Sequence, residues 1–136
     1  MDGFRLDVVR TPNVWIALAD GTRLAARLWR PDTEEPVPAI LEYLPYRKGD
    51  SMAARDESLG TWFSGHGFAY VRVDIRGTGD SDGVITDEYT RQEHHDALAV
   101  IAWLADTSWC SGAVGMVGIS WGGSTHCRWP PFARRR

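Results

Sequence analysis

The sequence lacks the features on which disulfide-linked and metal-binding proteins depend. It contains only two cysteines, Cys110 and Cys127, and no CxxC pair, which excludes a disulfide framework and gives no zinc or redox motif. Fifteen Lys and Arg residues are outnumbered by eighteen Asp and Glu residues. The net charge of −3 is therefore far from the strongly basic balance that is typical of nucleic-acid-binding proteins.

Long apolar runs are absent as well. Stretches such as residues 97–105 are much shorter than the roughly 18 residues that a membrane span needs. The first ten residues, MDGFRLDVVR, contain no apolar signal-peptide core. From these absences we expect a cytoplasmic protein with neither a nucleic acid nor a membrane as its partner.

The order of the predicted elements is that of an α/β fold within a globular chain of 136 residues, enough for one domain or part of one. Strands are expected at residues 14–19 and 24–29, on either side of the turn dipeptide Asp20-Gly21. Strands and helices then alternate: strands at 39–44, 68–74 and 114–119, helices at 59–66 and from the capping box Thr90-x-x-Glu93 to residue 105. This order predicts antiparallel opening strands followed by a parallel sheet.

Two segments predict loops. Residues 47–58 are charged and aperiodic, and residues 76–83 read RGTGDSDG. In the second of these, the glycines permit a tight path, and we expect Asp74 and Arg76 to form a charge-assisted bond that fixes the loop. The spacing of its glycines does not match a dinucleotide-binding loop.

The motif that carries chemistry is Gly118-Ile119-Ser120-Trp121-Gly122, a G-x-S-x-G sequence. It directly follows a predicted strand, which is where the strand-to-helix turn of an α/β-hydrolase exposes its nucleophilic serine. The alternative is a glycine-rich turn whose serine only forms local hydrogen bonds.

Four stretches between residues 10 and 123 resemble the N-terminal part of the Xaa-Pro dipeptidyl-peptidase-like serine hydrolases: VWIALADGTRLAARLWRP, LEYLPYRKGD, YVRVDIRGTGDSDG and SWCSGAVGMVGISWGG. The resemblance implies the α/β-hydrolase fold. It also implies acyl transfer from a small ester, an amide or a short peptide to water through an acyl-enzyme, with no cofactor and no metal. Esterase, peptidase and amidase activity remain alternatives.

The resemblance also assigns roles to three residues. Ser120 matches the nucleophile of the family, and the backbone N–H of Trp121 matches one donor of the oxyanion hole. Tyr46 matches the tyrosine whose hydroxyl supplies the second donor. A phenol O–H can replace a backbone N–H there, because both donate to the developing negative charge. The alternative for Tyr46 is an ordinary half-buried tyrosine after a strand.

The histidines suggest no other catalytic or metal site. The sequence His94-His95-Asp96 resembles a metal motif, but adjacent residues of a helix point in different directions and do not converge on one ion. His66, beside two glycines, is expected to be a turn residue.

The acid and base of a catalytic triad are missing from the chain. In α/β-hydrolases both follow the serine in chain order. Only 16 residues follow Ser120, with no acid and with one histidine, His126, on a presumed helix close to the serine. We therefore expect residues 1–123 to be a truncated hydrolase domain, inactive as this chain. The alternatives are a non-catalytic fragment or pseudo-enzyme, and an anion-binding module that uses the arginines of the tail.

The tail, residues 124–136, departs from the family pattern. It reads STHCRWPPFARRR, where an apolar helix is expected. Codons for these residues can be chosen so that the frame one base earlier encodes such a helix. The hypothesis is a frameshift near Gly123, and sequencing the gene tests it.

Overall fold

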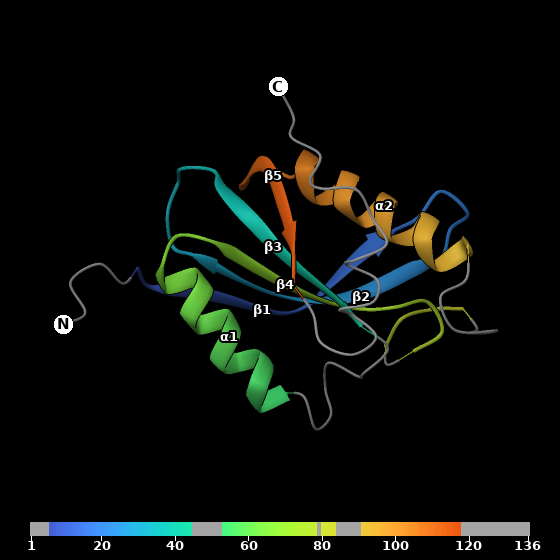
Figure 1. Cartoon of the computed structure of the whole chain (residues 1–136), viewed down its shortest axis with the longest axis horizontal. Helices are drawn as coiled ribbons and strands as arrows, with labels where there is room; N and C mark the ends of the chain where they lie inside the picture. The colour runs from blue at the N-terminus through green and yellow to red at the C-terminus, as the bar shows by residue number, and fades with distance from the viewer. Residues whose placement is uncertain (1–5, 45–52, 79, 84–90, 118–136) are drawn as a thin grey trace.

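The computed structural model describes residues 6–44, 53–78, 80–83 and 91–117, and within them it has one five-stranded mixed sheet and two helices (Figure 1). The strand order is β1-β2-β4-β3-β5. The elements are β1 (Val8–Ala17), β2 (Arg23–Pro31), β3 (Val37–Leu44), α1 (Ala53–Gly65), β4 (Ala69–Asp74), α2 (Arg91–Asp106) and β5 (Cys110–Met116).

An antiparallel hairpin, β1 and β2, opens the chain as predicted. Its turn contains Gly21, whose φ of 87° suits glycine. The Asp20 carboxylate accepts the Thr22 backbone N–H at 2.9 Å, which closes the turn locally. β1 is longer than predicted, and its pairing is interrupted between Thr11 and Val14, next to the proline that cannot donate a backbone hydrogen bond.

The rest of the sheet is parallel, with β3 between β4 and β5. α1 connects β3 to β4, and α2 connects β4 to β5. The two helices cover opposite faces of the sheet (Figure 1). Successive residues of β4 show this: Arg72 is paired with Asp56 of α1, whereas Val71 and Val73 belong to the core beneath α2. The predicted α/β class and the order of antiparallel and parallel strands are confirmed.

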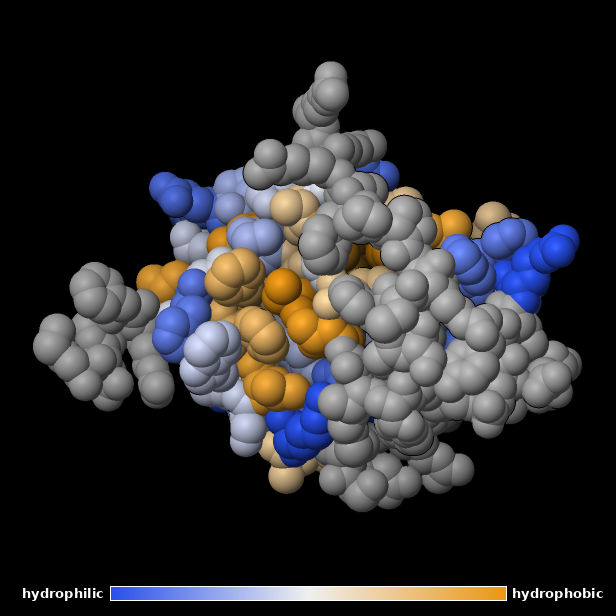
Figure 2. All heavy atoms as spheres, in the orientation of Figure 1, coloured by the Kyte–Doolittle hydropathy of each residue, from blue (hydrophilic) through white to orange (hydrophobic). Residues whose placement is uncertain are grey.

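The core lies between the sheet and α2. All six residues of β4 are buried. α2 contributes a buried stripe at helical spacing, Ala97, Val100 and Leu104. On the face shown in Figure 2, apolar residues gather near the middle and strongly hydrophilic residues lie mostly at the periphery. Among the described residues no helix combines the length and apolarity required to cross a lipid bilayer.

Two further predicted boundaries were wrong. The segment 47–58 was expected to be a loop, but residues 53–58 form the first half of α1. The charged side chains of this segment indicated a surface loop, but one of them lies inside the fold. Asp56 is fully buried against Arg72. The last strand runs Cys110–Met116 and so begins four residues before the predicted 114–119. The proposed tail, residues 124–136, lies outside the described residues.

Candidate functional site

The carboxyl ends of the three parallel strands meet at one edge of the sheet. Leu44 of β3 is paired with Asp74 of β4, and Leu41 of β3 with Met116 of β5. The chain leaves β3 toward α1 and leaves β4 toward α2, on the opposite face. In open α/β sheets, ligands bind outside the carboxyl ends of the strands at such a switch point. The candidate site is therefore this edge.

The three residues predicted for catalysis lie outside the described residues. Tyr46 is two residues beyond the end of β3, and Ser120 and Trp121 are four and five residues beyond the end of β5. Since β3 and β5 are parallel neighbours, the strands that lead to the predicted hydroxyl donor and to the predicted nucleophile end side by side. The roles of the three residues stay predictions.

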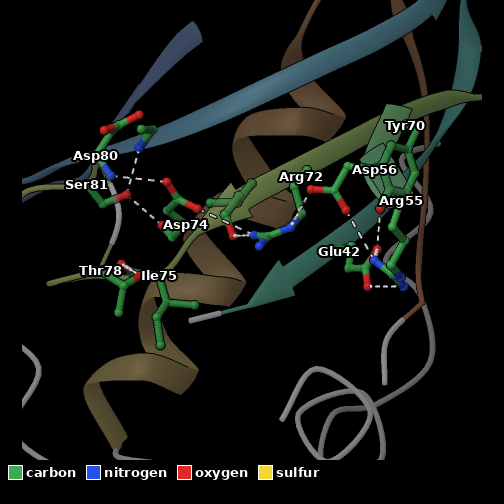
Figure 3. Close-up of polar contacts among 12 residues, drawn as sticks. Glu42, Arg55, Asp56, Tyr70, Arg72, Asp74, Ile75, Thr78, Asp80 and Ser81 are labelled. Carbon is green, nitrogen blue, oxygen red and sulfur yellow. Dashed lines mark hydrogen bonds and ion pairs between the residues drawn. The ribbon is translucent and has the colours of Figure 1, made fainter. Parts of the chain in front are cut away.

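The glycine-rich segment after β4 is a loop, as predicted, and side-chain hydrogen bonds hold it against the sheet (Figure 3). The Ser81 hydroxyl donates to the Asp74 carbonyl at 2.6 Å and accepts the Ala25 backbone N–H at 2.8 Å. The Asp80 backbone N–H donates to the Asp74 carboxylate at 3.1 Å. Gly83 has a φ of 93°, and a Cβ there would lie 2.6 Å from the Arg76 side chain, so the tight path requires glycine.

Arg76 has different partners from the one predicted. It was expected to pair with Asp74, but its guanidinium donates to Asp96 of α2 at 2.7 and 3.0 Å. It also lies 3.0 Å from the Asp20 carboxylate and donates to the Thr22 hydroxyl at 2.8 Å. The prediction failed because the chain turns after β4, so that Arg76 reaches α2, while Asp74 lies 3.5 Å from Arg72.

These contacts shift the pKa values of Arg76 and of its partner Asp20. The hydrogen bonds that the guanidinium donates to Asp96 outweigh burial and raise the pKa of Arg76 above its usual range, so the guanidinium is a permanent cation. Hydrogen bonds from Thr22, and then Arg76, lower the pKa of the Asp20 carboxyl. The loop after β4 is therefore fixed by charge to both the opening hairpin and α2.

A second group of charges lies between α1 and the sheet, and sequence reasoning missed it (Figure 3). The Arg55 guanidinium donates to both carboxylate oxygens of Glu42, at 2.7 and 3.0 Å. Arg72 lies 3.2 Å from the Asp56 carboxylate, and the Tyr70 hydroxyl donates to Glu42. The signal in the sequence is a charge in the middle of an otherwise apolar strand, Glu42 in AILEYL and Arg72 in FAYVRVD.

Burial dominates the electrostatics of this group. Glu42, Asp56 and Arg72 are each 0% exposed. Burial raises the pKa of Asp56, although the Arg72 charge opposes the rise. Burial and the Glu42 carboxylate raise the pKa of Tyr70 well above its usual range, so its hydroxyl remains a hydrogen-bond donor.

The ring of His66 has a structural role. His66 follows α1 in a turn, as predicted, with Nδ1 2.6 Å from the Trp62 carbonyl oxygen and its ring stacked on the Trp62 indole. Asp96, beside His94 and His95, binds Arg76 and Gln92. In the part of the chain that the structure describes, no group of three or more His, Cys, Asp or Glu residues could hold a metal ion.

Known proteins resemble the chain over most of its length. Residues 20–129 match the family model of the X-Pro dipeptidyl-peptidases (S15 family). A cocaine esterase of Rhodococcus sp. (strain MB1 Bresler) is 38% identical over 115 residues, which cover 83% of this chain. A putative Xaa-Pro dipeptidyl-peptidase of Streptomyces avermitilis is 36% identical over 118 residues, covering 65% of this chain.

The crystal structure of a CocE/NonD family hydrolase from Staphylococcus aureus has the same arrangement of elements, with a TM-score of 0.75 over 87% of this chain. At 24% identity this likeness shows the fold. The match covers a limited part of the relatives: 20% of the length of the cocaine esterase and 24% of the hydrolase from S. aureus. The chain thus spans about a fifth of the length of the curated relatives it matches.

Proposed function

We propose, since this chain belongs to the X-Pro dipeptidyl-peptidase (S15) family, that it supplies the nucleophile and the oxyanion donors of a serine hydrolase of ester or amide bonds. The observation that carries the proposal is the parallel pairing of β3 with β5. Because the two strands are parallel neighbours, the segments that contain Tyr46 and Ser120 start from the same edge of the sheet. A site that uses both residues requires this.

In the proposed reaction the Ser120 hydroxyl attacks the acyl carbon of the substrate. The Trp121 backbone N–H and the Tyr46 hydroxyl donate hydrogen bonds to the oxygen that becomes negative. Collapse of the tetrahedral intermediate expels the alcohol or amine and leaves an acyl-enzyme, which water then hydrolyses. None of these steps uses a cofactor or a metal.

The proposed substrates are small esters, amides or short peptides. Two relatives carry the names cocaine esterase and putative Xaa-Pro dipeptidyl-peptidase, and cleavage of an ester and of a peptide share the acyl-enzyme route. The proposed location is the cytoplasm, which is consistent with the free thiol of Cys110.

A serine hydroxyl is a weak nucleophile unless a base removes its proton. In these 136 residues Ser120 is followed by no Asp or Glu and by one histidine, His126, only six positions away. We therefore propose that the base and the acid come from protein outside these residues. The competing proposal is a non-catalytic product, and it rests on the same absence of an Asp or Glu after Ser120 in these residues.

Labelling with a fluorophosphonate probe tests the proposal. The complete gene product, which is the full-length protein with the reading frame restored after residues 1–123, is compared with the 136-residue chain. Each is made with and without Ser120→Ala, and Ser111→Ala serves as the control for an exposed serine. We expect labelling of the complete product, lost only on Ser120→Ala, and none of the short chain. Labelling that survives Ser120→Ala contradicts the proposed nucleophile, whereas labelling of the short chain at Ser120 contradicts the assignment of the base to other protein.

A further inference from the structure

The side of α1 that meets the sheet contains no large apolar side chain. The buried residues of this helix are Asp56, Gly60, Ser64 and Gly65. The first three recur every fourth residue and so form one stripe along the helix. By contrast, α2 buries an apolar stripe that includes Leu104. Burial of apolar surface therefore does not explain why this particular side of α1 faces the sheet.

The larger apolar residues of α1 lie away from the buried stripe. Leu59 and Phe63 each come one residue before a member of the stripe, so they lie about 100° around the helix from it. Both are half-buried, although Phe63 stacks on the ring of Tyr70 of β4, and Trp62 is 53% exposed. Because burial of apolar side chains is favourable, these residues alone would favour a helix turned so that Leu59 and Phe63 lie on the sheet.

Two ion pairs at the start of α1 hold the observed rotation instead (Figure 3). The Arg55 guanidinium donates to both carboxylate oxygens of Glu42 on β3, at 2.7 and 3.0 Å. The Asp56 carboxylate lies 3.2 Å from Arg72 on β4. Two parallel N–H···O bonds fix the orientation of a pair as well as its distance, and Glu42 is itself held by the Tyr70 hydroxyl. A turn of α1 about its own axis would carry both helix residues away from their partners.

The contact between Gly60 and Trp29 depends on the same rotation. A Cβ at Gly60 would overlap the indole ring of Trp29 on β2. This close approach exists only while the buried stripe faces the sheet. The free-energy cost of adding a methyl group at Gly60 therefore reports how α1 is turned.

We propose that the Glu42–Arg55 and Asp56–Arg72 pairs set the rotation of α1 on the sheet, against the preference of its apolar residues. Buried ion pairs add little net stability compared with apolar packing, and selecting one arrangement among alternatives is their best attested role. Here three of the four charged side chains are 0% exposed. An alternative rotation would leave these charges buried without partners, which costs more than burial of Leu59 would gain.

Arg55→Met together with Asp56→Ala, in the complete gene product, tests the proposal. This double variant removes one charge of each sign from α1 and adds no large apolar side chain to the buried stripe. Glu42 and Arg72 are register partners in the neighbouring strands β3 and β4, so each keeps an opposite charge beside it. The fold therefore loses the pairs of α1 without leaving an isolated charge in the interior.

The readout is the cost of Gly60→Ala, measured by urea unfolding in each background. In the parent we expect this substitution to lower the folding equilibrium constant roughly 5- to 150-fold, because the added methyl group meets Trp29. In the double variant the fall should be less than about threefold, or become a gain, since α1 can turn and Ala favours a helix over Gly. The matched control is Arg10→Met, which removes an exposed ion pair with Glu57 of the same helix and should leave the cost as it is in the parent.

Hydrogen exchange of the α1 amides distinguishes a turned helix from an unfolded one. We expect these amides to stay protected in the double variant. Loss of protection throughout α1 overturns the proposal, because the pairs would then hold the helix itself and not its rotation. An equal cost of Gly60→Ala in the parent and in the double variant also overturns it, since α1 then keeps its rotation without the charges.

A second variant keeps the test decisive if the double variant does not fold. Asp56→Asn keeps the shape of the side chain and removes its charge, while Arg72 retains Asp74 at 3.5 Å. The cost of Gly60→Ala should fall in this background as well. If Asp56→Asn does not fold either, the charges are required for folding and a role limited to the rotation of α1 is rejected. None of these outcomes depends on hydrolase activity.

Discussion

Arg76 and Asp96 join the loop after β4 to α2 through two hydrogen bonds of 2.7 and 3.0 Å. The same guanidinium reaches Asp20 and Thr22 in the turn of the opening hairpin. One side chain therefore connects three segments that are far apart in the sequence. This connection holds the loop at the sheet edge where the candidate site lies.

Arg76→Gln should lower the free energy of unfolding by about 3 kcal/mol, because it leaves a buried carboxylate without its cation. Asp96 is 3% exposed, and among the described residues its carboxylate retains only the hydrogen bond from Gln92 once Arg76 is gone. The measurement is urea unfolding of the complete gene product. Arg23→Gln, which breaks an ion pair whose side chains are 52% and 42% exposed, should cost less than about 1 kcal/mol. Equal losses in the two variants would contradict the prediction.

Gly60→Ala should destabilise the protein through overpacking. A Cβ at Gly60 would overlap the indole ring of Trp29. Trp29 is fully buried, and its Nε1 donates to Glu57 at 2.8 Å, so the ring has no free space to occupy. We expect a loss of about 1–3 kcal/mol in unfolding free energy. Ser58→Ala, on the exposed side of the same helix, should stay within about 0.5 kcal/mol; a similar loss there would mean that the helix, and not the contact with Trp29, is responsible.

The contacts of Glu57 should stabilise the fold at neutral pH and not in acid. Burial raises the pKa of this carboxyl, but hydrogen bonds from Trp29 and Arg10 outweigh it and hold the pKa below the ordinary value of 4.5. A carboxyl whose pKa is lower in the folded than in the unfolded protein stabilises the fold at pH values above its unfolded pKa. This stabilisation is lost as the pH falls through the folded pKa. The melting temperature of Glu57→Gln should therefore lie below that of the parent at pH 7, and the difference should shrink below about pH 4.5. A difference that is constant between pH 7 and pH 3 would exclude this origin.

The parts of the fold that the sequence predicted depend on local signals. The turn at Asp20-Gly21 follows from residues that are adjacent in the chain, and the helix α2 follows from the helical spacing of residues such as Ala97 and Leu104. The helical structure of residues 53–58 was not predicted, because it depends on a contact with a distant residue. In the sequence Asp56 resembles a surface charge, whereas in the structure it is paired with Arg72 of β4. The partner of Arg76 was missed for the same reason, since Asp96 is 20 residues away.

The candidate site was predicted from a motif and a family resemblance. The roles of Tyr46, Ser120 and Trp121 stay predictions, and the described structure shows only that β3 and β5 are parallel neighbours that run toward the same edge of the sheet. It adds the ion pair between Glu42 and Arg55, which no motif indicated. A pair whose members are 13 residues apart forms only when a strand and the helix after it pack together, and spacing alone does not reveal that packing.

Tyr46→Phe should reduce the rate of a complete enzyme and leave its stability almost unchanged. The substitution keeps the ring and removes one donor to the oxyanion, which typically costs about 10²–10³ in kcat. Turnover of an activated aryl ester by the complete gene product measures the effect, with KM expected to stay the same. The result separates a catalytic hydroxyl from a tyrosine that only packs.

Tyr43→Phe is the matched control, three residues earlier on β3. The Tyr43 side chain is fully buried, and its hydroxyl donates to the Glu93 carbonyl at 3.4 Å, on the side of the sheet that α2 covers. Its removal should cost about 1 kcal/mol in unfolding free energy and leave kcat within twofold. The two tyrosines should thus show opposite profiles, one lowering rate and the other lowering stability. If both substitutions lower kcat equally, or if Tyr46→Phe leaves turnover within a factor of two, the oxyanion role is wrong and Tyr46 is an ordinary tyrosine after a strand.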